Sequence, residues 1–311
     1  MTDKKLYLTR AQLISELGRC LGCKSKPCMN ACPVNCNPQE FIAKAKANDF
    51  AGAVETITRN NPMGQTCGLI CPDKFCMQAC TRAGIDFPIN IPRVQATILE
   101  KYRTAESAAH PKLPANGKKV AVIGAGPAGI AATAELSRLG YRITLFESFE
   151  KIGGALNLIP DKRLPFEVIA KDWSFIDDPD MIELRLNTPV NNPAALLEQD
   201  FDGVIVATGE PEGINLGIDG EEHAVSYLDY LRHPEHYAAR GNIAVIGGGA
   251  VATDCALTAV NNGAENVEMF VRRRVSDMRV TGEERKSLLD AGVDLTTMTK
   301  IKKIGADGDY L

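Results

Sequence analysis

The chain has 311 residues, of which 45% are hydrophobic and 24% are charged. This length allows two or three domains of ordinary size, and the composition is typical of globular proteins with real apolar cores. The net charge of −4 and the isoelectric point near 5.7 argue against nucleic acid or an anionic membrane as a partner. No apolar run is long enough to predict a transmembrane helix.

Residues 1–112 are predicted to form an all-helical domain. Thr9 can cap a first helix, and a second helix is predicted to begin at Asn37, which a proline follows in the first turn. Asp49 can cap a third helix, and another is expected around 94–102. The helices between the cysteine groups would act as a scaffold that brings the two groups together.

Nine of the ten cysteines lie in two groups within this domain: Cys20, Cys23, Cys28, Cys32 and Cys36, then Cys67, Cys71, Cys76 and Cys80. A proline follows one cysteine of each group directly. Such runs hold iron–sulfur clusters in bacterial-type ferredoxin segments, where the last cysteine of a run ligates the other cluster. Spacing alone therefore predicts one cluster on Cys20, Cys23, Cys28 and Cys80, and a second that includes Cys32, Cys71 and Cys76, with Cys36 or Cys67 as its fourth ligand.

Two other roles for the cysteines are less consistent with this pattern. Structural zinc would favour two isolated C-x2-C pairs, and only Cys20 with Cys23 has that spacing. Disulfides would require an oxidising compartment, whereas the first residues do not resemble a secretory signal. We therefore expect a reducing, cytoplasmic setting.

Residues 117–239 are predicted to form an α/β, doubly wound domain that binds FAD. A strand at 120–123 runs into a glycine-rich loop and a helix, and a second strand ends at Glu147. The loop consists of Gly124, Ala125, Gly126, Pro127, Ala128 and Gly129. Its three glycines should make the turn, admit the pyrophosphate and let the helix pack on the strand, in that order. Glu147 should accept the ribose hydroxyls, which selects FAD or NAD over NADP, and a buried strand is expected at 202–209. The alternative is a glycine-rich turn without a ligand.

Residues 240–311 contain a second pattern of this kind and are predicted to bind a nicotinamide cofactor. A strand at 243–246, a glycine loop at 247–252 and a helix at 253–262 precede a strand that ends in Arg272, Arg273 and Arg274. Arginines at this position can bind a ribose 2′-phosphate, which favours NADPH, although a solvated basic strand end is the alternative. Residues 290–303 resemble a helix end and a strand, and 305–311 resemble an opening hairpin. A doubly wound domain that stops there lacks its closing strands, so we expect truncation.

Several motifs together resemble one family. They are the cysteine pattern, Gly124–Gly129, Gly153–Gly154, Ile159–Pro160 with Arg163–Pro165, and Val206–Gly209. From about residue 19 to 280 the chain is similar to the electron-input module shared by the small (beta) subunit of glutamate synthase and the N-terminal half of dihydropyrimidine dehydrogenase. The resemblance implies two [4Fe-4S] clusters in a helical domain, an FAD domain and an inserted NADPH domain. Electrons would pass from NADPH through FAD and the clusters to a partner active site.

The resemblance also implies a ligand that spacing does not predict. Residues 89–95 are similar to the dehydrogenase segment whose glutamine ligates the second cluster, which makes Gln95 its fourth ligand. Cys36, Cys67 and Cys255 would then be buried thiols. Glutamate synthase-type chains tend to carry glutamate at this position, so Gln95 favours the dehydrogenase branch.

The nucleotide contacts implied by the resemblance fall in both α/β domains. For FAD they are Gly124, Ala125, Gly126, Pro127, Ala128, Gly129, Glu147, Gly154 and Arg163. For NADPH they are Gly248, Gly249, Ala250, Val251, Arg272, Arg273 and Arg279. The chain departs from the family at Ala250, where an aspartate or asparagine is usual.

The expected function is that of an enzyme subunit whose task is to place cofactors, and which needs no general base or nucleophile of its own. The partner would be a flavin-dependent pyrimidine reductase or a glutamate synthase large subunit, in a hetero-oligomer. The alternative from another class is a cluster-bearing scaffold protein whose nucleotide domains only dock a partner.

Overall fold

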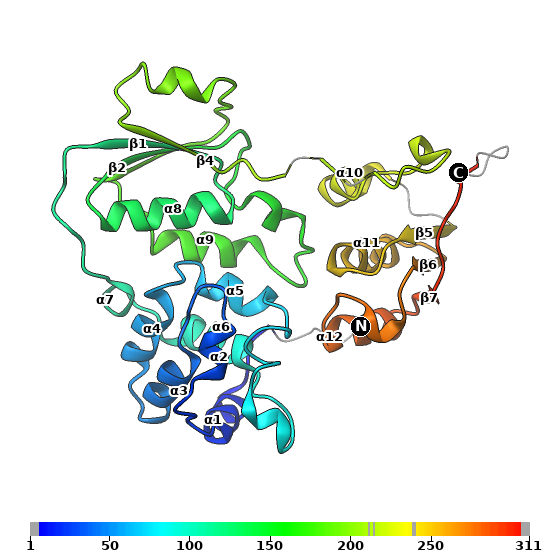
Figure 1. Ribbon diagram of the computed structural model, residues 1–311, viewed down its shortest axis with the longest axis horizontal. Helices are drawn as coiled ribbons and strands as arrows, with labels where there is room; N and C mark the ends of the chain where they lie inside the picture. Colours follow the sequence, from blue (N-terminus) through cyan, green and yellow to red (C-terminus); the bar gives the residue numbers. More distant parts are fainter. Residues whose placement is uncertain (1–5, 211, 214, 238–240, 306–311) are drawn as a thin grey trace. The chain divides into compact units, whose positions relative to one another are not determined.

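The computed structural model describes residues 6–210, 212–213, 215–237 and 241–305, which form two compact units. The first unit comprises the residues up to 156 together with 161–209, and the second comprises 157–160 together with 210 onward. The hairpin predicted at the end of the chain lies, from 306 onward, outside the described residues. Figure 1 shows the elements and their labels.

The N-terminal part of the first unit is helical over its described residues, as predicted. Its helices are α1 (Arg10–Arg19), α2 (Pro27–Asn30), α3 (Pro38–Lys46), α4 (Phe50–Thr58), α5 (Gly64–Ile70), α6 (Ile91–Tyr102) and α7 (Ala105–Ala108). Thr9, Asn37 and Asp49 cap α1, α3 and α4 through their side chains, which confirms the three predicted helix starts. α6 begins three residues before the predicted 94–102, because Asn90 caps it and Pro92 occupies its first turn.

The helical core is a single cluster of aliphatic side chains to which cysteines from both groups contribute. Phe41, Ile42, Val54, Ile57 and Ile98 are almost completely buried at its centre. Cys36 and Cys76 belong to the buried set, and Cys20, Cys28, Cys32 and Cys80 pack against it. Apolar side chains of α3 and α4 therefore form part of the core against which the cysteines pack.

A four-stranded parallel sheet forms the rest of the first unit. Its strands are β1 (Lys119–Ile123), β2 (Arg142–Phe146), β3 (Ile182–Arg185) and β4 (Gly203–Val206), in the order β3-β2-β1-β4. The helices of this part are α8 (Pro127–Arg138) and α9 (Phe166–Ser174), and α9 packs on α5. Neighbouring strands in register, such as Val122 with Leu145, confirm the parallel sheet predicted from the fingerprint. β4 was predicted to be buried, but Val206 is 59% exposed because β4 is the last strand at its edge.

The second unit contains a three-stranded parallel sheet in the order β5-β6-β7. Its elements are α10 (Tyr227–Arg232), β5 (Asn242–Ile246), α11 (Ala250–Asn261), β6 (Asn266–Val271), α12 (Gly282–Asp290) and β7 (Asp294–Thr297). The predicted helix at 253–262 starts three residues earlier, at the glycine loop itself. Short 3-10 helices connect the elements of both units: η1 (Thr81–Gly84), η2 (Gly154–Leu158), η3 (Pro193–Leu196), η4 (Glu221–His223), η5 (Pro234–His236) and η6 (Val275–Asp277). Among the described residues no helix has both the length and the apolar character needed to cross a membrane.

Candidate functional site

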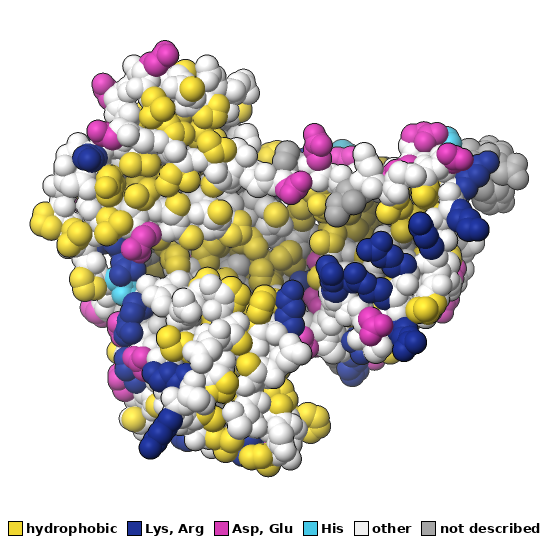
Figure 2. Space-filling model, viewed as in Figure 1, with side chains coloured by type: hydrophobic (Ala, Val, Ile, Leu, Met, Phe, Trp, Pro, Cys, Tyr) yellow, Lys and Arg dark blue, Asp and Glu magenta, His cyan; other side chains and the backbone are white. Residues whose placement is uncertain are grey.

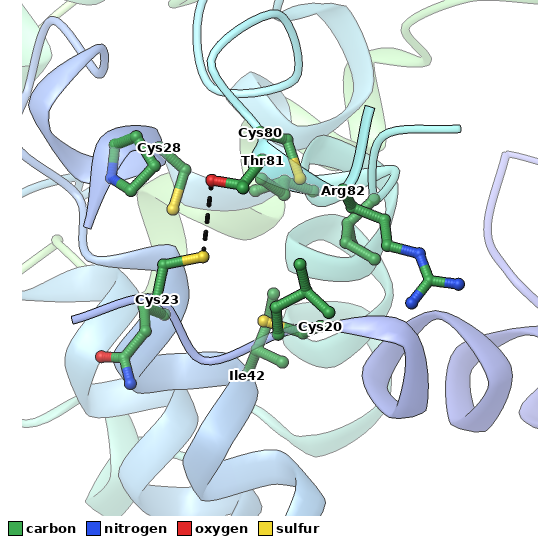
Figure 3. A pocket seen from close by; sticks show the side chains of 12 residues that line it. Cys20, Cys23, Cys28, Ile42, Cys80, Thr81 and Arg82 are labelled. Atoms are coloured by element: carbon green, nitrogen blue, oxygen red, sulfur yellow. Dashed lines mark hydrogen bonds between the residues drawn. The ribbon is translucent and has the colours of Figure 1, made fainter. Parts of the chain in front are cut away.

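The four cysteines predicted to hold the first cluster converge on one cavity. Cys20, Cys23, Cys28 and Cys80 all line it, together with apolar side chains such as Ile42. Figure 3 shows their side chains reaching into the same space, Cys20, Cys23 and Cys28 from one stretch of the chain and Cys80 from another. The Cys23 Sγ lies 3.5 Å from the Thr81 hydroxyl oxygen, which places the segment after Cys80 beside the first cysteine group.

The chemistry of this donor set fits an iron–sulfur cluster. Burial raises the pKa of the Cys28 thiol, and the neighbouring Cys20 and Cys80 raise it further. Thiolates crowded in this way repel one another unless a metal centre balances their charge. The ten cysteines are free of disulfides, so the thiols needed for such a centre are present.

The three cysteines assigned to the second cluster lie near enough to influence one another electrostatically. The pKa of the Cys71 thiol is raised by burial and by Cys32, and burial raises that of Cys76 to about 12, with Cys71 and Cys32 adding to the effect. These mutual influences bring together the three cysteines that spacing assigned to a second cluster. Burial also raises the pKa of Cys36, which lies near Cys32 and Cys76.

Gln95, on α6, lies beside Cys36. Its side-chain nitrogen Nε2 donates to the Gly64 carbonyl at 2.6 Å, and the Cys36 Sγ donates to its oxygen Oε1 at 3.7 Å. The amide is therefore held at both ends, with only a weak thiol donor on its oxygen. Gln95 Oε1 and Cys36 Sγ are thus neighbouring candidate ligands, and Cys36 lies near Cys32 and Cys76.

The three cysteines expected to be spare thiols differ in exposure. Cys36 and Cys255 are buried, as predicted, at 3% and 8% exposed. Cys67 is intermediate in exposure as a whole residue, but burial raises the pKa of its thiol to about 12, so the thiol itself is enclosed as predicted.

The first glycine loop has the geometry that its fingerprint predicts. Gly124 has a φ of +102°, and a Cβ there would lie 2.4 Å from the Ala207 carbonyl oxygen. A Cβ at Gly129 would lie 1.8 Å from the Gly124 carbonyl oxygen, so these two glycines are required by the fold. A Cβ at Gly126 would lie 3.8 Å from the nearest atom, the Gly154 Cα, so there is room for a ligand to approach the backbone here.

The residues around this loop fit the phosphate and ribose of a dinucleotide. Gly126 is the N-cap of α8 and no side chain caps that helix, so its first amides are open to a phosphate. Glu147 is 6% exposed, and its Oε2 accepts from the Ala125 amide at 2.8 Å. Its Oε1 accepts from the Phe149 amide at 3.0 Å, so the loop and strand end hold the carboxylate in place. Arg163 is half-buried in the following segment.

The second glycine loop repeats this arrangement in the second unit. A Cβ at Gly248 would lie 2.5 Å from the Val271 Cγ1, whereas Gly249 has no atom within 4 Å of that position. Gly249 is the N-cap of α11, again without a side-chain cap, and Ala250 is the first residue of that helix. Val251 is 44% exposed at the same helix start. Open amides therefore lie at both helix N-termini where a nucleotide is predicted.

The basic residues predicted to select NADPH lie around the second loop. The Arg279 amide donates to the Gly248 carbonyl at 3.1 Å, and Arg279 pairs with Gly249 in a parallel bridge. Arg272 follows β6 directly; Arg272 and Arg279 are exposed, and Arg273 is half-buried. Figure 2 shows a group of Lys and Arg side chains on this unit. The site is therefore electropositive and open.

Comparison with known proteins assigns these features to a family. Residues 1–107 match the family described as dihydropyrimidine dehydrogenase domain II, 4Fe-4S cluster. Residues 122–173 match an NAD(P)-binding Rossmann-like domain, and residues 178–311 match pyridine nucleotide-disulphide oxidoreductase. The NAD-dependent dihydropyrimidine dehydrogenase subunit PreT of Escherichia coli (strain K12) is 34% identical over 293 residues, which cover 91% of this chain and 70% of PreT. The chain belongs to the PreT family.

Other relatives agree with this assignment. The PreT of Salmonella typhimurium is 35% identical over 294 residues, covering 91% of this chain and 70% of that protein. The putative oxidoreductase YgfK of Escherichia coli O157:H7 is 32% identical over 294 residues, covering 92% of this chain but 28% of YgfK. Among solved structures, histamine dehydrogenase from Rhizobium sp. 4-9 has a TM-score of 0.54 at 20% identity, covering 85% of this chain and 38% of that one, which shows a shared fold.

The family confirms the predicted class and branch. The chain is an electron-transfer subunit of the NAD(P)H-dependent flavin iron–sulfur oxidoreductases, related to dihydropyrimidine dehydrogenase. Iron–sulfur, FAD and nicotinamide cofactors agree with its matched domains.

Sequence reasoning missed one buried group of the first unit. Asp172 on α9 and Arg103 after α6 form an ion pair whose two side chains are completely buried. Neither residue lies in a motif, and they are far apart in the chain. Only the aspartate's place in an amphipathic helix, on the face of Val168 and Ile169, could have drawn attention to it.

Proposed function

We propose that the chain takes electrons from a nicotinamide cofactor and passes them through FAD and two [4Fe-4S] clusters to a partner subunit that reduces a pyrimidine. The observation that carries the proposal is the convergence of Cys20, Cys23, Cys28 and Cys80 on one cavity, beside a second set of donors. Both sets belong to the same compact unit as the glycine loop predicted to bind FAD. The substrate follows from the PreT relatives, which are named as dihydropyrimidine dehydrogenase subunits.

The residues divide the task in the following way. The first cluster would be held by Cys20, Cys23, Cys28 and Cys80, and the second by Cys32, Cys71, Cys76 and Gln95. We prefer Gln95 to Cys36 because the Gly64 carbonyl accepts from the Gln95 Nε2. This hydrogen bond fixes the amide group with its oxygen, Oε1, pointing away from Gly64. FAD supplies the exchange between a two-electron nicotinamide donor and one-electron carriers. The helical, FAD and nicotinamide domains would comprise 1–112, 117–239 and 240–311, in a cytoplasmic hetero-oligomer.

The protein's own residues contribute binding and orientation. The open amides at Gly126 and Gly249 would receive the two pyrophosphates, and Glu147 would orient the flavin ribose. Arg272, Arg273 and Arg279 would surround a ribose 2′-phosphate, which favours NADPH. The PreT relatives are named as NAD-dependent, so the choice between NADPH and NADH must be tested separately from the rest of the proposal.

The experiment is an anaerobic titration of the protein, with its clusters and FAD restored, by NADPH and by NADH. We expect the flavin absorbance to bleach and the clusters to become reduced. A flavin that neither cofactor bleaches would overturn the proposal and leave the scaffold interpretation. Arg272→Ala should weaken the binding of NADPH more than that of NADH. The matched control Arg274→Ala, two residues further along the same turn, should not. A ratio of NADPH to NADH affinity that is unchanged in both variants would reject NADPH selection by Arg272.

A further inference from the structure

A buried ion pair joins the helical part of the first unit to the sheet part. Arg103 Nη1 donates to Asp172 Oδ1 at 2.7 Å, and both side chains are 0% exposed. The Arg103 guanidinium also lies 4.1 Å from the centre of the Phe175 ring. Burying two charges is unfavourable unless both are fully engaged, and such pairs often serve to specify geometry. The other bonds of Asp172 indicate which geometry this pair specifies.

Asp172 caps a helix that lies 106 residues earlier in the chain. α5 has no cap from its own N-cap residue, Met63. Instead, Asp172 Oδ2 accepts from the Thr66 amide at 2.8 Å and Oδ1 accepts from the Gln65 amide at 3.4 Å. A carboxylate at this position satisfies free amides and interacts favourably with the positive end of the helix. The other end of α5 is Cys71, a predicted ligand of the second cluster.

The start of α5 also holds Gln95. The Gly64 carbonyl at the first residue of α5 accepts from Gln95 Nε2. Further along, a Cβ at Gly68 would lie 2.7 Å from both the Ala96 amide nitrogen and the Pro92 carbonyl oxygen. α5 and α6 are thus in direct backbone contact, and close-packed elements of this kind transmit a displacement rather than absorb it. A shift of α5 must therefore move Gln95 and Cys71 together.

We propose that Asp172 is a positioning residue for the second iron–sulfur cluster. It acts through α5 on Cys71 and Gln95, and so keeps that cluster in a fixed position relative to the sheet predicted to bind FAD. The inference rests on the proposed function for the identity of the cluster. Loss of its charge would leave Arg103 without a counter-ion, and an amide in its place would offer one acceptor oxygen where the carboxylate uses two for Arg103, Gln65 and Thr66.

The test compares Asp172→Asn with Asp178→Asn in the full chain with restored clusters. Asp178 is a matched control because it lies six residues further along and pairs with Lys112, which is 53% exposed. After reduction with dithionite, Asp172→Asn should alter the electron paramagnetic resonance signal of one cluster and leave the other unchanged. Amide hydrogen exchange over 65–71 should accelerate about 5- to 30-fold, as expected for a weakened helix cap. The control should change neither measurement.

An Asp172→Asn protein with both signals and the exchange of 65–71 unaltered would overturn the proposal, as would equal changes in both clusters. If that variant does not fold, Asp172→Glu keeps the charge but moves the carboxylate, and must still alter the signal of the same cluster; unaltered spectra there overturn the proposal too. Dithionite reduces the clusters directly. A flavin that no nicotinamide bleaches would therefore refute the proposed function without touching this result.

Discussion

Replacement of Gly126 by alanine should separate the needs of the fold from those of the ligand. Gly126 has φ −76° and ψ −177°, a conformation that alanine adopts freely. Its added Cβ would lie 3.8 Å from the Gly154 Cα, an ordinary contact. Such a replacement stabilises a protein by about 0.4–1 kcal/mol, because alanine has fewer unfolded conformations. At about 2–4 °C per kcal/mol for a domain of about 200 residues, the Tm without FAD should rise by about 1–4 °C.

The same methyl group should weaken FAD binding, because it fills the space through which the pyrophosphate approaches the loop. Overpacking of this kind costs about 1–3 kcal/mol, which corresponds to an increase of about 5- to 150-fold in the Kd for FAD. Circular dichroism melting of the flavin-free protein gives the Tm, and quenching of flavin fluorescence gives the Kd.

Gly129→Ala is the matched control, because its Cβ would lie 1.8 Å from the Gly124 carbonyl oxygen and must push α8 away from β1. It should lower the Tm and weaken FAD binding together. A Gly126→Ala protein that binds FAD as tightly as the original would refute the placement of the pyrophosphate. A fall in its Tm equal to that of Gly129→Ala would refute the geometry of the loop.

Three further predictions concern the helical part. Cys20→Ser should remove about half of the iron, since it breaks one of two clusters, whereas Cys36→Ser should leave the iron content unchanged; equal losses in an iron assay would contradict the ligand sets. Gln95→Glu should change the paramagnetic resonance signal of the second cluster alone, and an identical spectrum would count against Gln95 as a ligand. Chiefly through burial, the pKa of His110, beside the Thr58 hydroxyl, lies below its ordinary 6.5. The unfolded chain therefore binds more protons, and stability falls as the pH drops below about 6.5. Urea unfolding should show that the free energy of unfolding falls less between about pH 7 and about pH 5 in His110→Gln than in the original protein. An equal fall in both proteins would remove His110 as the cause.

The sequence by itself determined the features that depend on neighbouring residues. Thr9, Asn37 and Asp49 were recognisable as caps because each accepts a hydrogen bond from the amide three residues ahead. The glycine loops were recognisable because a positive φ or a close backbone approach leaves glycine as the only fitting residue. Class and family followed from these local patterns and from the spacing of the cysteines, without knowledge of any distant contact.

Only the tertiary structure decided which distant groups meet. Spacing had already grouped Cys80 with Cys20, and the structure brings them to one cavity across 60 residues of chain, whereas spacing left the fourth ligand of the second cluster open between Cys36 and Cys67. The cap of α5 comes from Asp172, whose place in the sequence carries no capping signal because its partners precede it by 106 residues. The exposure of side chains also depended on the assembled fold. The sequence of β4 predicts a buried strand, but β4 lies at the edge of its sheet and Val206 is exposed.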